Sequence, residues 1–362
     1  MKTCTKCILP TNFPNIKFND EGVCNYCLSY TPIKYQGEFA LRNLLKCYCA
    51  KGRKYDCIVP VSGGKDSTFV LYQTVKIYKM RVLAANYDAG FTSDQAKENL
   101  KNTIKKLGVD FVSIKSKRDI QKKHLRDNIK AWALKPSSEA FPDLCSGCET
   151  GYLNGAYKIA GRMGIPLIIL GDSEMERSTF KKVYYPRLHK SYFINLSMRF
   201  MQNPSYYSPK NIFHDLLGSA EFSLPAHFYR YTTRNPFRII HWFDYIPYDE
   251  RQLLSTVTNE LGWKKAKSFA SSWRFDCQIH ALVDYMFRKK LGFSEKDELY
   301  SKLIREGILS RDEAVKRIEL EKENEELQLA TINELFDKLG LSKEKKRILL
   351  MFERVDLQET RT

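Results

Sequence analysis

The stretch VPVSGGKDSTFV, residues 59–70, joins an apolar segment to a segment with helical character. Its apolar start is typical of a short buried strand, and two glycines, a lysine and hydroxyl side chains follow. Gly63 and Gly64 allow the backbone to come close to a ligand. Successive N–H groups at the start of a helix attract anions, and Lys65 adds a positive charge. The stretch therefore predicts a phosphate-binding loop between a strand and a helix.

The segments on either side of this loop alternate between strand and helix patterns. We expect strands at 56–61, 80–87, 109–114 and 165–171, and helices at 67–78, 93–108 and 151–164. Ser93 is a plausible cap for the second helix, and Gly108 a plausible stop. Apolar strands separated by helices of this length form a parallel sheet that is covered on both faces. The sequence thus predicts an α/β fold with a doubly wound parallel sheet, and such sheets bind ligands outside the carboxyl ends of their strands.

The composition divides the 362 residues into four parts. They are a cysteine module at 1–30, the nucleotide-binding domain at 31–185, an aromatic and basic substrate-binding segment at 186–247, and a helical C-terminal domain at 248–362. The third part includes one further expected strand at 238–243. The fourth carries three patterns typical of helix N-termini, namely Ser294–Asp297, Ser310–Glu313 and Thr331–Glu334.

The cysteine module contains CTKC at 4–7 and CNYC at 24–27, which together read C-x2-C-x16-C-x2-C. Four thiolates at this spacing suit a closed tetrahedral zinc site that can hold a segment too small to form its own core. Catalysis at such a site is not expected, because four protein ligands leave no open position. The alternative is two pairs of reduced thiols without a metal. The predicted zinc ligands are Cys4, Cys7, Cys24 and Cys27.

The net charge of +17, from 59 basic and 42 acidic residues, favours anionic partners such as nucleotides or nucleic acid. A charge that only keeps the protein soluble is the alternative. The longest apolar run is far too short for a membrane span, and MKTCTKCILP has no apolar core of a secretory signal. The sequence therefore predicts a cytoplasmic protein without a membrane partner.

The motif SGGKDS differs from the Walker loop, because Asp66 follows the lysine and the earlier glycine is missing. It resembles the pyrophosphate loop (PP-loop) of the N-type ATP pyrophosphatases, which have an adenine nucleotide alpha hydrolase-like fold and cleave ATP between the α- and β-phosphates. The resemblance implies catalytic roles for Lys65, Asp66 and Ser67. It also implies that the β- and γ-phosphates and Mg²⁺ are held by Ser62, Gly63, Gly64, Lys65, Asp66 and Ser67.

Three acidic side chains beyond the loop are further candidates for the same site. Asp88, in NYDAGF at the end of the second expected strand, is the expected polar contact to the nucleotide. Asp172 or Glu174, in GDSEME after a later strand, could help to hold the metal. The alternative role for these acids is to cap a helix N-terminus.

Within this superfamily the chain is similar to the N-acetyl sugar amidotransferases of O-antigen and related surface-glycan biosynthesis. The similarity includes CTKC and CNYC, VSGGKDST, CSGCETG at 145–151 and the C-terminal stretch that begins WRFDCQIH at 273. It implies an enzyme that adenylates the acetamido oxygen of a nucleotide-activated sugar and replaces it with ammonia-derived nitrogen, giving an acetamidino group. Residue 2 is Lys, so no glutaminase nucleophile follows the initiator Met. The resemblance therefore implies separate glutaminase and cyclase-like subunits that supply ammonia.

A second cysteine group consists of Cys145, Cys148 and Cys277. Three cysteines of this kind ligate an iron–sulfur cluster in the tRNA thiolases that the chain also resembles. Here they could hold an iron–sulfur cluster or a second zinc, with His280 as a further ligand, or they could be structural thiols.

Two alternatives to the amidotransferase remain open. One is a PP-loop tRNA thiolase, for which tRNA would be the partner, and the other is a non-catalytic nucleotide-binding subunit. The C-terminal stretch from 273 favours the amidotransferase. The basic and aromatic stretch at 181–238 could bind the nucleotide-sugar, and its candidate residues for a diphosphate or carboxylate are Arg187, Lys190, Arg199 and Arg230.

Overall fold

The computed structural model describes residues 2–49, 52–116, 119–134, 144–181, 237–266, 269 and 271–351. Within these ranges the strands form a five-stranded sheet in the order β3-β2-β1-β4-β5, and every pair is parallel. This confirms the doubly wound parallel sheet. The strands are β1 (Cys57–Pro60), β2 (Val82–Asp88), β3 (Asp110–Lys115), β4 (Leu167–Leu170) and β5 (Arg238–His241).

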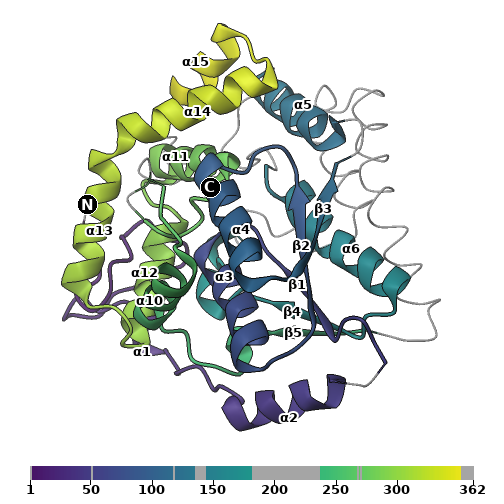
Figure 1. The fold of residues 1–362 in the computed structure, drawn as a ribbon. Helices are drawn as coiled ribbons and strands as arrows, with labels where there is room; N and C mark the ends of the chain where they lie inside the picture. The colour runs from purple at the N-terminus through teal and green to yellow at the C-terminus, as the bar shows by residue number, and fades with distance from the viewer. Residues whose placement is uncertain are drawn as a thin grey trace.

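The two faces of the sheet pack against different helices, because side chains alternate along each strand. Ile58 of β1 and its neighbours in β2 and β4 belong to a core with α6 (Ser146–Met163). Val59, one residue later, belongs to the larger core with α3 (Lys65–Tyr72) and α4 (Asp94–Leu107). Figure 1 shows α6 on one side of the sheet and α3 and α4 on the other. The chain winds outward from β1 to β3 and then crosses back to β4 on the other side of β1, so the strand order reverses between β1 and β4.

The remaining α-helices include most of the C-terminal region, as expected. Helix α5 was not anticipated from the sequence. Their bounds are α1 (Asn25–Leu28), α2 (Glu38–Tyr48), α5 (Ile120–Leu134), α10 (Glu250–Leu261), α11 (Gln278–Leu291), α12 (Glu295–Arg305), α13 (Arg311–Glu323), α14 (Glu325–Leu339) and α15 (Lys343–Met351).

Capping residues mark the ends of several of these helices, as the sequence predicts. Ser93 caps α4 by accepting from the Ala96 N–H, and Gly108 ends it in the left-handed conformation, at φ 63°. The patterns at Ser294 and Ser310 begin α12 and α13. The prediction that a helix begins at Thr331 is wrong, because this residue lies inside α14, which already begins at Glu325. A hydroxyl in a helix can donate to the carbonyl four residues back, and Thr331 does so.

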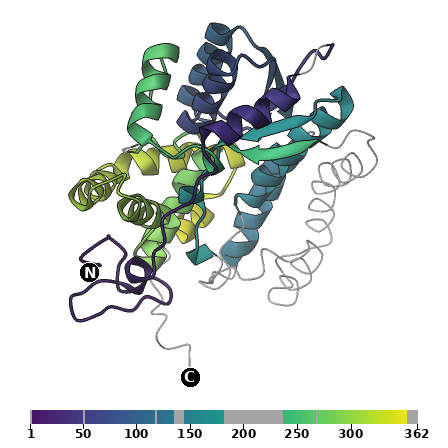
Figure 2. The same cartoon turned by 90° about the horizontal axis from the view of Figure 1, so that it is seen from below.

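The N-terminal cysteine module packs against the C-terminal helices, although almost the whole chain separates them in sequence. The Ile8 N–H lies 3.3 Å from the Ser301 hydroxyl of α12, and Nε of Arg311 in α13 donates to the Cys7 carbonyl at 3.1 Å. The ring of Phe13 lies 5.1 Å from that of Phe293. Figure 2 shows this N-terminal segment beside the C-terminal helices. The two ends of the described chain therefore share one core.

None of the helices in the described ranges is both long enough and apolar enough to cross a bilayer.

Candidate functional site

The phosphate loop lies between the end of β1 and the first residue of α3, where the sequence predicts it. Gly63 has φ 89°, and a Cβ there would lie 2.1 Å from the Ala96 carbonyl oxygen of α4. Both the backbone conformation and the close approach of α4 therefore require glycine at this position. A Cβ at Gly64 would lie 3.2 Å from Oδ2 of Asp276, so this glycine leaves room for a carboxylate from the C-terminal region.

Hydrogen bonds within the loop hold its two serines at the start of α3. The Ser62 N–H donates to Oγ of Ser67 at 3.3 Å, and the Gly64 N–H donates to Oγ of Ser62 at the same distance. The two hydroxyl oxygens are 3.5 Å apart. Both serines line a cavity, together with the N-terminal turn of the eight-residue helix α3. This arrangement provides hydroxyl groups and backbone N–H groups to an anion.

Lys65 is almost completely buried, with 1% of its surface exposed. Its Nζ lies 2.7 Å from Oδ2 of Asp66 and 5.6 Å from the ring centre of Tyr248. Burial lowers the pKa of Lys65, but attraction to Asp66, Tyr248 and Glu250 outweighs burial and raises it well above its ordinary value. The loop lysine therefore remains positively charged.

The loop opens into a cavity of about 910 Å³. Its walls come from the ends of β1, β2 and β4, from α6 and from the C-terminal region between Ser272 and Phe287. This volume lies within the range of pockets that enclose a nucleotide-sized ligand. The cavity lies at the carboxyl edge of the sheet, beside the point where the strand order reverses, which is where open α/β sheets bind ligands.

The three acids that the sequence nominates beyond the loop occupy different places. Asp172 lines the cavity, and its Oδ1 lies 2.8 Å from Nδ1 of His241, a contact that raises the histidine pKa. Asp88 instead accepts from the Gly90 N–H at 2.9 Å and closes a turn after β2. Glu174 is on the surface, where it pairs with Arg177. Only Asp172 of these three is among the residues that line the cavity.

Two carboxylates at the cavity were missed by the sequence reasoning. Glu176 lies at the end of the 3-10 turn Glu174–Glu176, and burial followed by repulsion from Asp66 raises its pKa to about 7. The pKa of Asp276 is also raised by burial. Glu176 stands in GDSEME, beside the nominated Glu174, but no pattern in this stretch separates the two acids. Asp276 carried no local signal beyond its position next to Cys277.

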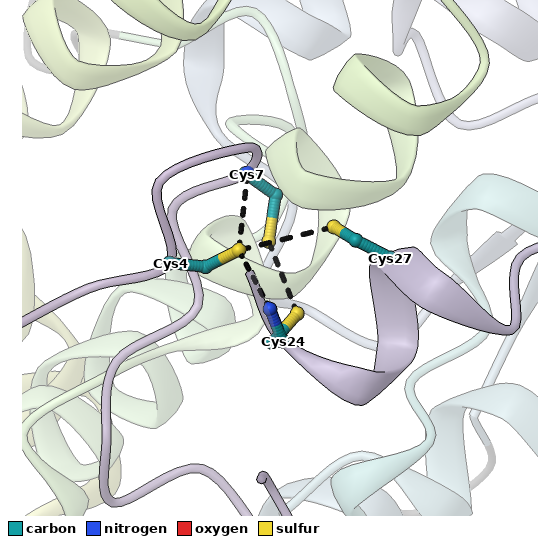
Figure 3. A group of neighbouring side chains, drawn as sticks. All are labelled: Cys4, Cys7, Cys24 and Cys27. Atoms are coloured by element: carbon teal, nitrogen blue, oxygen red, sulfur yellow. Dashed lines mark hydrogen bonds between the residues drawn. The ribbon is translucent and has the colours of Figure 1, made fainter. Parts of the chain in front are cut away.

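The four N-terminal cysteines point toward one another (Figure 3). Their sulfur atoms all lie within 4.8 Å of one another, with Cys4 and Cys27 at 4.0 Å and Cys7 and Cys24 at 3.8 Å. Four sulfurs placed tetrahedrally around zinc at about 2.3 Å would be roughly 3.8 Å apart. The Cys24 N–H donates to the sulfur of Cys4 at 3.2 Å, which stabilises a thiolate. The group therefore fits a tetrahedral metal ion.

The second cysteine group is arranged differently. Cys145, Cys148 and Cys277 are half-buried and all line the cavity, and burial raises the pKa of Cys277 to about 11. Within the described part of the chain, only the N-terminal group brings three or more such ligand atoms within 4.8 Å of one another. The buried His280 lines the same cavity, with its ring 5.1 Å from Trp273. The metal at these cysteines stays a prediction.

Several further predictions cannot be compared with the structure. The candidate sugar-binding residues lie outside the described residues, namely Arg187, Lys190, Arg199 and Arg230. The domain boundaries after residues 30, 185 and 247 also stay predictions.

The parallel sheet, with a glycine-rich loop between β1 and α3, defines an α/β protein. Residues 252–354 match the family model described as the C-terminal domain of WbpG-like LPS biosynthesis proteins. This match confirms the resemblance to the N-acetyl sugar amidotransferase family, and it supports a role in surface-glycan biosynthesis.

Two individual proteins are also similar. An uncharacterized protein of Methanocaldococcus jannaschii is 23% identical over 333 residues, which cover 90% of this chain and 95% of that protein. Among solved structures, the U34-tRNA thiolase NcsA from Methanococcus maripaludis, with its 4Fe–4S cluster, matches with a TM-score of 0.35 and 13% identity. That match covers 95% of this chain and 90% of the thiolase.

Proposed function

We propose that this protein is an ATP-dependent amidotransferase that converts the acetamido group of a nucleotide-activated N-acetyl sugar into an acetamidino group during surface-polysaccharide biosynthesis. One observation carries the proposal. The phosphate loop and the segment Ser272–Phe287 line the same cavity, and the whole of that segment lies within the WbpG-like region 252–354. A general nucleotide loop and a region typical of glycan biosynthesis therefore surround one space.

The reaction follows from the chemistry of the amide. An amide oxygen is a poor leaving group, so it first attacks the α-phosphorus of ATP and releases pyrophosphate. Ammonia then adds to the activated carbon, and AMP leaves with the original oxygen. Lys65 and the N–H groups at the start of α3 would stabilise the charge on the departing pyrophosphate. The cavity would hold both substrates close together, which lowers the entropic part of the barrier.

Magnesium would neutralise further charge on the phosphates when it is bound. The loop fits such an ion, because Oδ1 of Asp66 is buried and has no hydrogen-bond partner within the described residues. Glu176 lines the same cavity and interacts electrostatically with Asp66. Asp66 and Glu176 would therefore provide the oxygen ligands that Mg²⁺ prefers.

The sugar nucleotide would enter beside the positively charged side chains of the cavity wall. Arg177, Lys181 and Arg274 line the cavity on the side of the C-terminal region. Guanidinium and ammonium groups there suit a diphosphate or a sugar carboxylate. Zinc is the metal we propose for the N-terminal cysteines, and separate glutaminase and cyclase-like subunits would supply the ammonia.

The tRNA thiolase remains a second candidate because of one observation. Cys145, Cys148 and Cys277 line the same cavity as the phosphate loop, where an adenylated substrate would be formed. Sulfur chemistry at this position would require a cluster or a thiolate next to the nucleotide. Binding to tRNA would then weaken as the salt concentration rises.

The test measures pyrophosphate release with MgATP, ammonium and a panel of UDP- and CMP-linked acetamido sugars, and follows the sugars by mass spectrometry. Release together with replacement of oxygen by an imino group is the expected result. If the panel is silent and pyrophosphate appears only with unmodified tRNA and a sulfur donor, the protein is a thiolase and the amidotransferase proposal is wrong.

A further inference from the structure

A short segment around Asp276 is one of the places where the C-terminal region reaches the phosphate loop, and Trp263 is another. This segment pairs with the chain that follows β2, where Thr92 and Cys277 form an antiparallel bridge. The Ser93 N–H donates to the Asp276 carbonyl and the Gln278 N–H donates to that of Phe91, both at 2.9 Å. The backbone is therefore fixed on both sides of Asp276, next to the N-terminus of α4.

The Asp276 side chain meets the loop from this fixed position. It is hydrogen-bonded to Ser62, and its Oδ2 lies 3.2 Å from the point where a Cβ at Gly64 would be. Asp276 also lines the cavity. A carboxylate thus lies at the place where phosphates are expected, and Gly64 leaves the space for it.

A carboxylate at a phosphate loop repels the ligand unless a cation lies between them. Asp66 and Glu176 are close enough to influence this place too, because Asp66 acts electrostatically on both Asp276 and Glu176. The cations among the groups that act on Asp276 or Glu176 are Lys65 and Arg274, and both are already in ion pairs. Lys65 pairs with Asp66 at 2.7 Å, and Arg274 is shared between Glu295 at 3.4 Å and Glu176 at 4.0 Å, so two cations face four carboxylates. The carboxylates around the loop would therefore repel a bound polyphosphate unless a divalent cation lies between them.

We propose that Asp276 is a metal-binding residue of the nucleotide site, where it provides an oxygen ligand to the divalent cation that accompanies ATP. This inference rests on the proposed function, since it concerns the same nucleotide. It adds that the WbpG-like region contributes a charged group to the PP-loop site as well as a wall of the cavity. A metal on Asp276 would also free the Ser62 hydroxyl to donate to a phosphate.

The experiment measures binding of a non-hydrolysable ATP analogue to the full chain by calorimetry at graded Mg²⁺ concentrations. Asp276→Asn keeps the shape and the acceptor for Ser62 but removes the negative charge. We expect this variant to need at least about tenfold more Mg²⁺ for half-maximal binding, the scale seen when support of a metal site is lost. Asp94→Asn is the matched control, because it makes the same change at an exposed carboxylate that pairs with Lys97 and is not among the residues that line the cavity. Its Mg²⁺ dependence should match the parent.

The outcomes separate the inference from the proposed function. Equal Mg²⁺ dependence in Asp276→Asn and the parent would overturn the inference and leave Asp276 as a partner of Ser62 only. Failure of the parent to bind the analogue at any Mg²⁺ concentration would overturn the proposed function as well. Asp276→Ser, which is neutral and smaller, gives the second test if Asp276→Asn does not fold, and the same increase in required Mg²⁺ is expected.

Discussion

The N-terminal cysteine module and the cavity over the phosphate loop both concentrate reactive side chains, but they are built in opposite ways. The module buries its four thiols, brings them within 4.8 Å of one another and surrounds them with backbone N–H donors. The cavity leaves an open volume in which Glu176 and Asp276 have raised pKa values. A closed set of four ligands stabilises structure, whereas perturbed and incompletely compensated groups around a cavity are typical of sites that bind and react.

The largest effect is expected from Cys24→Ser, which removes one ligand of the N-terminal cysteine module. Structural zinc in small modules contributes on the order of 10 kcal/mol to folding. Loss of one thiolate should therefore release the metal and lower the melting temperature strongly, because the module packs on α12 and α13. Metal analysis and thermal unfolding measure both effects. Cys47→Ser is the matched control, since Cys47 is exposed on α2 and should keep parental metal and stability. A parent protein without zinc would refute this assignment.

Lys65→Met is expected to affect the cavity over the phosphate loop, with little effect on the N-terminal cysteine module. Methionine keeps the buried volume but removes the charge beside Asp66. Loss of one preorganised charge of this kind costs on the order of 10²–10³ in rate. Pyrophosphate release should fall by that factor while the zinc content stays at the parental value. Lys97→Met, which changes an exposed lysine on α4, should retain full turnover.

Retained turnover in Lys65→Met would remove the loop from the catalytic site. A simultaneous loss of zinc would mean that the phosphate loop and the N-terminal cysteine module are coupled.

The sequence predicted those parts of both regions that depend on local patterns. The spacing of Cys4, Cys7, Cys24 and Cys27 predicted a group that the structure brings together, because two short knuckles fold on themselves. The alternation of apolar strands and helices predicted the sheet, and the glycines of SGGKDS predicted where the loop lies. Each of these signals is a local pattern of spacing, periodicity or residue type.

The remaining parts of the candidate site depend on contacts between distant segments. Asp276 reaches the loop only because residues 276–278 pair with residues 91–93. Trp263 donates to Gly63 across 200 residues of sequence. A single 3-10 turn decides that Glu176, and not Glu174, lines the cavity. No periodic pattern in the sequence indicates how this turn is oriented. Local propensity contains no information about such pairings, so the sequence could not rank these residues.

Glu176→Gln tests whether the cavity over the phosphate loop holds this carboxylate in an unfavourable environment. The folded-state pKa of Glu176 is about 7 against an ordinary value of 4.5, so the folded protein holds a proton that the unfolded chain has lost between these two pH values. The stability contributed by this carboxyl is therefore complete below pH 4.5 and is lost as the pH rises to about 7. The change is on the order of 3 kcal/mol.

Glutamine is neutral at every pH, so the variant should lack this part of the decline and be more stable than the parent at pH 8. Denaturant unfolding between pH 4 and 8, without nucleotide, measures the difference. Asp88→Asn is the matched control, because Asp88 closes a turn and is not among the residues that line the cavity. Parallel stability curves for Glu176→Gln and the parent would show that Glu176 is not held in an unfavourable environment.

The smallest effect is expected from Trp263→Phe, which loosens the phosphate loop without removing any charge. The indole N–H donates to the Gly63 carbonyl at 3.0 Å, and phenylalanine keeps most of the ring contact with Phe275. One such hydrogen bond contributes about 1 kcal/mol. We expect a several-fold higher KM for ATP with nearly unchanged kcat, because the loop must then be ordered by the nucleotide. A fall in kcat with unchanged KM would instead mean that the indole contact matters mainly in the transition state, and that the resting loop is held by its own hydrogen bonds.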